Sequence, residues 1–265
     1  MDPKVIPGHE SEDVAAWAAM DLRERLLGIM DEKDHWAWPF LTRPGLSRAQ
    51  LWVHFRHEYQ VYVRDFPVLL ARVLGQGPPA DVRGALAENI YEEQTGGLSV
   101  GRAHPELFLE MMEGLGFEPR ELETSVPALE TEAVTYRRFL DQVTVASPWF
   151  VGAAVMTIFV EGSRHERAEL DGVRTSVAPE EAIAAHPLVR YYGCPPERMT
   201  LVRAHREVEG GHRRDAWRMV LAHTAEDPVQ GERVESAVYR ALTLWTAYRD
   251  GVARAMGLTK SPISL

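Results

Sequence analysis

Hydrophobic side chains recur at steps of three and four residues along most of the chain, which is the period of an amphipathic helix. We find no convincing run of alternating polar and apolar residues between turn-forming residues, as a β-strand would require. The pattern therefore predicts an all-α fold. The predicted helices cover residues 12–30, 47–74, 81–95, 105–114, 126–145, 148–161, 196–223 and 228–256.

Proline, glycine and capping residues mark the ends of these helices. The linker 38–45 contains two prolines and a glycine, and Ser47 is suited to cap the helix that follows. Ser147 and Pro148 provide a cap and a first-turn proline for the most apolar helix. The helix ends therefore agree with the helical periodicity.

The chain is large enough for one well-packed domain, because 45% of its 265 residues are hydrophobic. Seven or eight helices with short links and no shift in composition predict a single helical domain over residues 1–265. Within it, residues 1–11 and 258–265 are expected to be flexible tails.

Charge and hydropathy limit the partners. Thirty-nine acidic and 29 basic residues give a formal charge of −10, which opposes attraction to nucleic acid or to anionic membranes. The longest apolar stretch, residues 149–160, is shorter than the roughly 20 residues of a membrane-spanning helix. We therefore expect no nucleic-acid partner and no membrane association. The single cysteine, Cys194, and the polar N-terminal segment indicate a cytoplasmic protein.

Three residues that can bind metal form one stripe of a predicted helix. His205, Glu209 and His212 are spaced four and three residues apart, which places them on one helical face. Taken alone, this stripe is more typical of a solvated helix face than of a metal site.

A lone carboxylate ends the most apolar helix. Glu161 follows a long apolar run, and burying an unpaired carboxylate is costly unless it is protonated or bound to a cation. Polar residues 163–166 come directly afterwards. Glu161 therefore either marks the emergence of the helix into solvent or is held inside by a cation.

A third segment joins paired acids to a histidine. Glu92 and Glu93 precede two glycines, and His104 opens the next helix, so a carboxylate and an imidazole can meet there. The three segments together supply Glu92, His104, Glu161, His205, Glu209 and His212. Three carboxylates and three imidazoles suit two adjacent metal ions, and favour non-haem iron over structural zinc.

These motifs, together with residues 55–67, resemble the haem-oxygenase-like diiron oxidases and oxygenases, relatives of thiaminase II and pyrroloquinoline-quinone synthase. The resemblance covers residues 35–217 and implies a bundle of about seven helices. It also implies that the six residues bind two Fe²⁺ ions, with dioxygen as co-substrate and no catalytic residue beyond the ligands.

The sequence departs from the family pattern at three points. The gap between Glu92 and His104 is longer than in compact members, and Glu209 stands where many relatives have aspartate. Helical phase places Glu93 on the apolar face instead of Glu92. We choose Glu92 as the ligand because a helix that ends in two glycines can unwind in its last turn, and keep Glu93 as the alternative.

The leading hypothesis is a non-haem iron-dependent oxidoreductase acting on a small amino-acid-like or fatty-acid-like substrate, as the resemblance implies. The arginines of the 196–223 helix weakly favour a substrate that carries a carboxylate. In one subfamily the enzyme's own tyrosines and lysine are the substrate, but those positions here are Trp38, His54 and Asp171, so an external small molecule is expected. A homodimer is one compatible assembly.

Two other function classes stay open. One is a cofactorless or cysteine-dependent enzyme that acts on a heterocycle, as in the quinone-cofactor and thiamin-salvage relatives. A thiaminase II needs a cysteine nucleophile, whereas Cys194 lies between Gly193 and Pro195 in an expected loop. The other class is a helical binding protein without catalytic activity.

Overall fold

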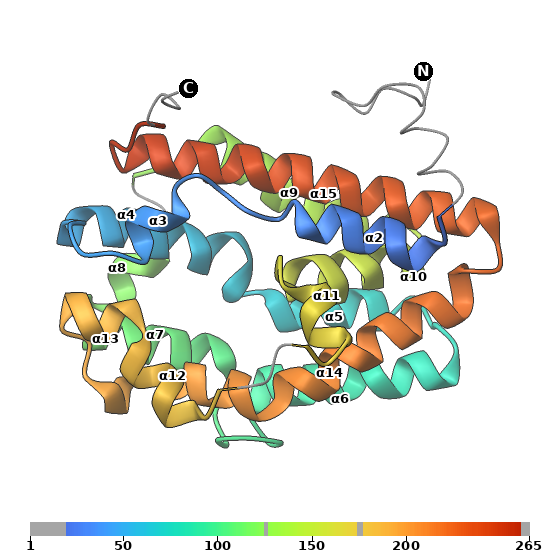
Figure 1. Ribbon diagram of the computed structural model, residues 1–265, viewed down its shortest axis with the longest axis horizontal. Helices are drawn as coiled ribbons and strands as arrows, with labels where there is room; N and C mark the ends of the chain where they lie inside the picture. The colour runs from blue at the N-terminus through green and yellow to red at the C-terminus, as the bar shows by residue number, and fades with distance from the viewer. Residues whose placement is uncertain (1–19, 125–126, 174–176, 261–265) are drawn as a thin grey trace.

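The computed structural model describes residues 20–124, 127–173 and 177–260, and every regular element in these ranges is a helix (Figure 1). The all-α prediction is therefore confirmed. The start of the first predicted helix, and the predicted tails except residues 258–260, lie outside the described residues. No described helix combines the length and apolar character needed to cross a bilayer.

Nine helices carry most of the fold: α2 (Leu22–Asp31), α4 (Arg48–Glu58), α5 (Phe66–Leu74), α6 (Ala80–Thr95), α7 (His104–Gly114), α9 (Thr131–Val145), α10 (Trp149–Ala153), α14 (Thr200–Thr224) and α15 (Pro228–Ala255). Further elements lie between them: α3 (Trp38–Leu41), α8 (Pro119–Glu123), α11 (Glu166–Leu170), α12 (Pro179–Ala185), α13 (Pro187–Tyr192), two π-helical segments, η1 (Tyr59–Val63) and η2 (Ala154–Val160), and a 3₁₀ turn, η3 (Pro196–Arg198).

The helix predicted over residues 47–74 is wrong as one continuous element. Ser47 caps α4 as expected, in a reciprocal capping box with Gln50. The chain then passes through η1 and breaks at Asp65, and α5 begins with Phe66. Pro67 explains the break, because proline lacks the N–H that a continuous helix would need to bond to the carbonyl oxygen four residues earlier.

The helix predicted over residues 126–145 begins later, at Thr131, and the short helix α8 before it was not predicted. The helix predicted from residue 196 likewise starts at Thr200, after the 3₁₀ turn η3. Element type was correct in both cases, and the errors concern where each helix begins.

The helix formed by α10 and η2 lies at the centre of the fold. In Figure 1, α15 and α2 run along one side of the molecule and α14 and α6 along the opposite side. η2 contacts both α15 and α14, and its side chains from Ala154 to Phe159 are buried. Burying each large apolar side chain contributes about 1.5–3 kcal/mol. The core therefore fixes η2, and with it Glu161 at its end.

A second apolar cluster holds α7 in place. Leu107 and Met112 of α7 pack there with Cys194 and Met199, which precede α14. Since α7 and α14 share this cluster and contact one another, their positions are coupled. These two helices carry His104 and His205.

Candidate metal centre

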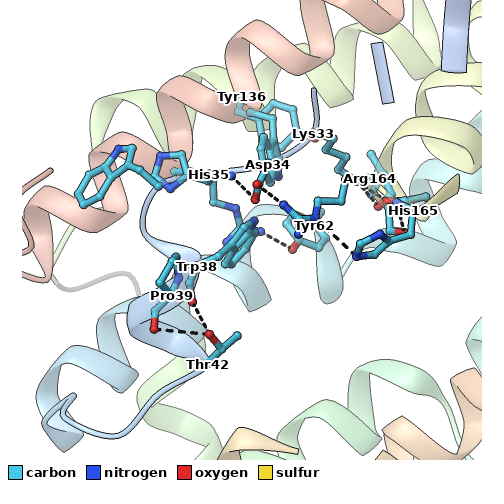
Figure 2. A pocket seen from close by; sticks show the side chains of 16 residues that line it. Lys33, Asp34, His35, Trp38, Pro39, Thr42, Tyr62, Tyr136, Arg164 and His165 are labelled. Atoms are coloured by element: carbon cyan, nitrogen blue, oxygen red, sulfur yellow. Dashed lines mark hydrogen bonds and ion pairs between the residues drawn. The ribbon is translucent and has the colours of Figure 1, made fainter. Parts of the chain in front are cut away.

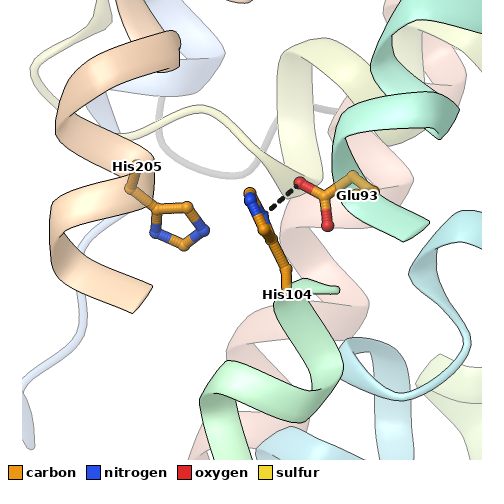
Figure 3. Close-up of side chains that lie close together, drawn as sticks. All are labelled: Glu93, His104 and His205. Carbon is orange, nitrogen blue, oxygen red and sulfur yellow. Dashed lines mark ion pairs between the residues drawn. The ribbon is translucent and has the colours of Figure 1, made fainter. Parts of the chain in front are cut away.

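Glu93, His104 and His205 converge from three helices (Figure 3). Each offers one ligand atom, and these atoms lie within 4.8 Å of one another. His104 Nδ1 is 2.9 Å from Glu93 Oε1, and the rings of His104 and His205 are 5.0 Å apart between centroids. Three donor atoms this close can bind one metal ion.

The loop between α6 and α7 brings Glu93 and His104 together. α6 ends at Thr95, and Gly96 follows in the left-handed region, with φ of 62°. A side chain at Gly96 would lie 2.3 Å from the carbonyl oxygen of Arg102, so only glycine fits this close approach. The loop therefore folds back tightly, and α7 begins with His104.

Glu92 stabilises this loop and orients His104. Its buried carboxylate accepts hydrogen bonds from the Leu98 backbone N–H at 2.7 Å and from the Ser99 hydroxyl. It also lies 3.1 Å from His104 Nε2. Burial acts against ionisation, but these hydrogen bonds hold the pKa of Glu92 below its ordinary value.

The two nitrogens of His104 therefore face different acids. Nε2 can donate to Glu92, which leaves Nδ1 directed at Glu93. Nδ1 is buried and has no hydrogen bond within the described part of the chain, despite its short distance to Glu93. Burial opposes protonation, but Glu93 and then Glu92 raise the pKa of His104 above its ordinary value. This nitrogen is therefore suited to bind a cation that Glu93 would also bind.

Glu161 lies against α6, beside the convergent group. Its Oε1 accepts a hydrogen bond of 2.8 Å from the side-chain amide of Asn89, one turn before Glu93. Burial, and then the negative charge of Glu93, raise the pKa of Glu161 to about 8. Glu161 is only partly exposed and its carboxyl group is bonded to α6, so the helix does not simply release it into solvent. Two neighbouring carboxylates are the arrangement that a cation stabilises.

The expected ligand set is thus only partly visible. The structure brings His104 and His205 together, with Glu93 instead of Glu92 as the third member. The reason for choosing Glu92 was wrong, because α6 stays helical to Thr95 and does not unwind at the glycines.

α14 continues through Glu209 and His212, so the predicted spacing lies on one uninterrupted helix. The side chains of these two residues lie outside the described residues. Their role as ligands stays a prediction.

Arginines of α14 are engaged by neighbouring helices. Arg203 pairs with Glu180 of α12, and Arg213 pairs with Glu166 and Glu169 of α11. These pairs attach the short helices to α14, so both arginines have structural partners. They add no support to the expectation that this helix binds a carboxylate substrate.

Cys194 follows Gly193 in the link between α13 and η3, as expected. Its side chain is buried, and Sγ lies 3.5 Å from the sulfur of Met199. Burial raises the pKa of the thiol to about 11. The thiolate that nucleophilic catalysis requires is therefore disfavoured here.

A cavity of about 750 Å³ lies beside the segment that carries Glu161 (Figure 2). Val160 and Gly162 line it, while Glu161 between them is bonded to Asn89 of α6. Lys33 and Arg249 also line the cavity, and sequence reasoning missed both. Only Arg249 had a local signal, as a charge on the core-facing side of an amphipathic helix.

Comparisons with known proteins agree with this fold. A family model described as iron-containing redox enzyme matches residues 53–246. The crystal structure of a TenA homologue from Pseudomonas syringae pv. tomato DC3000 is similar, with a TM-score of 0.63 and 15% identity over 96% of this chain and 100% of that chain. A search of curated proteins found no significant match. Because the family model matches well over half of the sequence, the chain belongs to the iron-containing redox enzyme family, with the haem-oxygenase-like fold.

Proposed function

We propose that the protein is a non-haem diiron enzyme that uses dioxygen to oxidise a small organic substrate. The observation that carries the proposal is the convergence of Glu93, His104 and His205. Two imidazoles and one carboxylate form the donor set typical of non-haem Fe²⁺ sites with open coordination positions. Membership of an iron-containing redox family supports the same metal.

The residues take distinct roles in this proposal. Glu93, His104 and His205 would hold one ion, and Glu161, Glu209 and His212 would complete the second. Glu92 would orient His104 by accepting its Nε2 proton, as carboxylates beside metal-bound histidines commonly do. When bound, the two ferrous ions would supply the electrons for reduction of dioxygen.

The protein itself supplies a rigid setting. The buried apolar side chains of η2, from Ala154 to Phe159, hold in place the helix that ends at Glu161. The Asn89 amide donates to Glu161 Oε1 and fixes the carboxyl group on the side of α6. Glu161 holds a proton at neutral pH in the metal-free protein, which metal binding would release.

The test is metal content after anaerobic reconstitution with Fe²⁺. We expect about two irons per chain in the unmodified protein, and loss of at least one in a His104→Ala, His205→Ala double variant. His223→Ala is the matched control, because this histidine lies on α14 and pairs with Asp81 outside the convergent group. Less than one iron per unmodified chain, or full retention by the double variant, would contradict the proposal.

The environment of Cys194 supports this proposal over a cysteine-dependent enzyme. Its thiol is buried, has a raised pKa and does not line the cavity. A Cys194→Ser variant should therefore keep both its iron and its oxygen consumption. Loss of catalysis with iron content unchanged would favour the cysteine-dependent alternative.

A further inference from the structure

We propose that the cavity beside Glu161 (Figure 2) binds an aromatic carboxylate, with the carboxylate between Lys33 and Arg249 and the ring against the neighbouring tryptophans Trp38 and Trp245. The inference that this ligand is the substrate rests on the proposed function. Binding itself does not, because none of the cavity residues belongs to the proposed ligand set.

The cavity has the size and lining of a small-molecule site. Its volume of about 750 Å³ lies within the roughly 300–1,000 Å³ typical of such sites. Its walls come from the link after α2, from α3, η1, α9 and α15, and from the segment around Glu161. Five aromatic side chains line it: Trp36, Trp38, Tyr62, Tyr136 and Trp245.

Lys33 presents a cation that no acid neutralises directly. Its ammonium donates to the backbone carbonyl oxygens of Phe159, Val160 and Gly162, and no carboxylate contacts it within the described ranges. It also lies 4.7 Å from the ring centroid of Phe159. The carbonyl oxygens stabilise the ammonium but carry no negative charge, so a nearby anion would stabilise it further.

Arg249 is a second buried cation in the same wall. Its guanidinium pairs with Glu58, contacts the hydroxyl of Tyr62 at 3.2 Å and lies 4.8 Å from the ring centroid of Trp38. Its Nε has no acceptor among the described residues. A buried donor without a partner is costly, so a ligand oxygen at this position would be stabilising.

The two cations lie within electrostatic reach of one another. Burial, and then the charge of Arg249, lower the pKa of Lys33 to about 7, although Glu166 and Glu58 act in the opposite direction. A third cation at the edge, Arg164, is already paired with Asp34. An anion between Lys33 and Arg249 would reduce their mutual repulsion, whereas a cationic ligand would increase it.

The aromatic wall selects the rest of the ligand. Trp38 and Trp245 lie 6.0 Å apart between ring centroids, at 47° to each other, and Arg249 covers both rings. A planar ring can stack on such surfaces and gains about 0.5–1.5 kcal/mol per favourable aromatic pair beyond the area it buries. A saturated ring of the same size cannot gain this stacking energy.

Calorimetric titration of the metal-free full-length protein with 3-phenylpropionate tests the proposal. We expect at least tenfold weaker binding of 3-cyclohexylpropionate, which lacks the aromatic ring, and of 3-phenylpropanamide, which lacks the charge. The proposal is overturned if 3-phenylpropionate shows no binding at millimolar concentration, or if either analogue binds equally well.

Variants locate the site. Lys33→Met and Trp38→Leu should each weaken 3-phenylpropionate binding at least tenfold while the protein keeps its cooperative thermal transition. Arg72→Gln, which removes a cation paired with Asp141 elsewhere, is the control and should bind normally. Unchanged binding by both folded cavity variants would place the ligand elsewhere. Iron content is measured separately. If the protein binds 3-phenylpropionate but takes up no iron, only the diiron proposal is contradicted.

Discussion

His104 Nδ1 lies 2.9 Å from Glu93 Oε1, across the loop that joins α6 and α7. Glu92, the residue before Glu93, contacts the other nitrogen of the same ring, with Oε1 at 3.1 Å from His104 Nε2. Two consecutive acids of one helix thus contact both sides of one histidine. This division separates the residue that would bind a metal from the residue that would orient its ligand.

Glu93→Gln and Glu92→Gln should therefore have different effects on iron binding. Glu93→Gln removes a ligand and should abolish one of the two binding steps. Glu92→Gln removes the acceptor for His104 and should weaken binding by about 10–100-fold without removing the step. Anaerobic titration with Fe²⁺ distinguishes the two. If Glu92→Gln loses the step and Glu93→Gln keeps it, Glu92 is the ligand, as the family pattern implied.

The fold was largely predictable because its signals are local. Helical periodicity and the prolines and glycines at helix ends gave the all-α class and the order of the long helices. Helical phase points to Glu93, whereas the family position and an unwound last turn of α6 would favour Glu92; α6 does not unwind there.

The cavity was not predictable in the same way. Lys33 meets residues 159–162, and Arg249 meets Glu58, across more than a hundred positions of sequence. Such contacts depend on how the helices pack, and no spacing within one helix reveals them.

Glu161 should make the stability of the metal-free protein depend on pH. Its pKa is raised from 4.5 to about 8, so the protonated form stabilises the fold fully below about pH 4.5, and this contribution is lost as the pH rises through 8. Glu161→Gln stays neutral throughout. Its melting temperature relative to the unmodified protein should therefore increase between pH 5 and pH 9.

Glu226→Gln is the control for that series, because Glu226 is exposed on the turn after α14. Its difference from the unmodified protein should stay nearly constant over the same range. A constant difference for Glu161→Gln as well would show that this carboxyl group ionises freely in the folded protein.

Cys194 should be unreactive in the native protein. Its thiol is buried and its pKa is raised to about 11, so little thiolate is present at pH 8. Labelling with a chromogenic disulfide should be at least 100-fold slower in the native protein than in denaturant. Rapid stoichiometric labelling without denaturant would show that the link between α13 and η3 opens readily.

Gly96→Ala should destabilise the loop that joins the two acids to His104. Gly96 has a φ of 62°, and an added Cβ would lie 2.3 Å from the carbonyl oxygen of Arg102. Gly77→Ala is the matched control, because Gly77 also has a positive φ, of 69°, but no atom lies within 4 Å of its added Cβ. We expect Gly77→Ala to lower the free energy of unfolding by about 1 kcal/mol through backbone strain alone.

Gly96→Ala should lower the free energy of unfolding clearly more. It should also weaken iron binding, because the displaced loop moves Ser99 and Leu98 away from Glu92. Equal unfolding free energies for the two variants, with iron binding unchanged, would mean that the loop adapts without disturbing the centre.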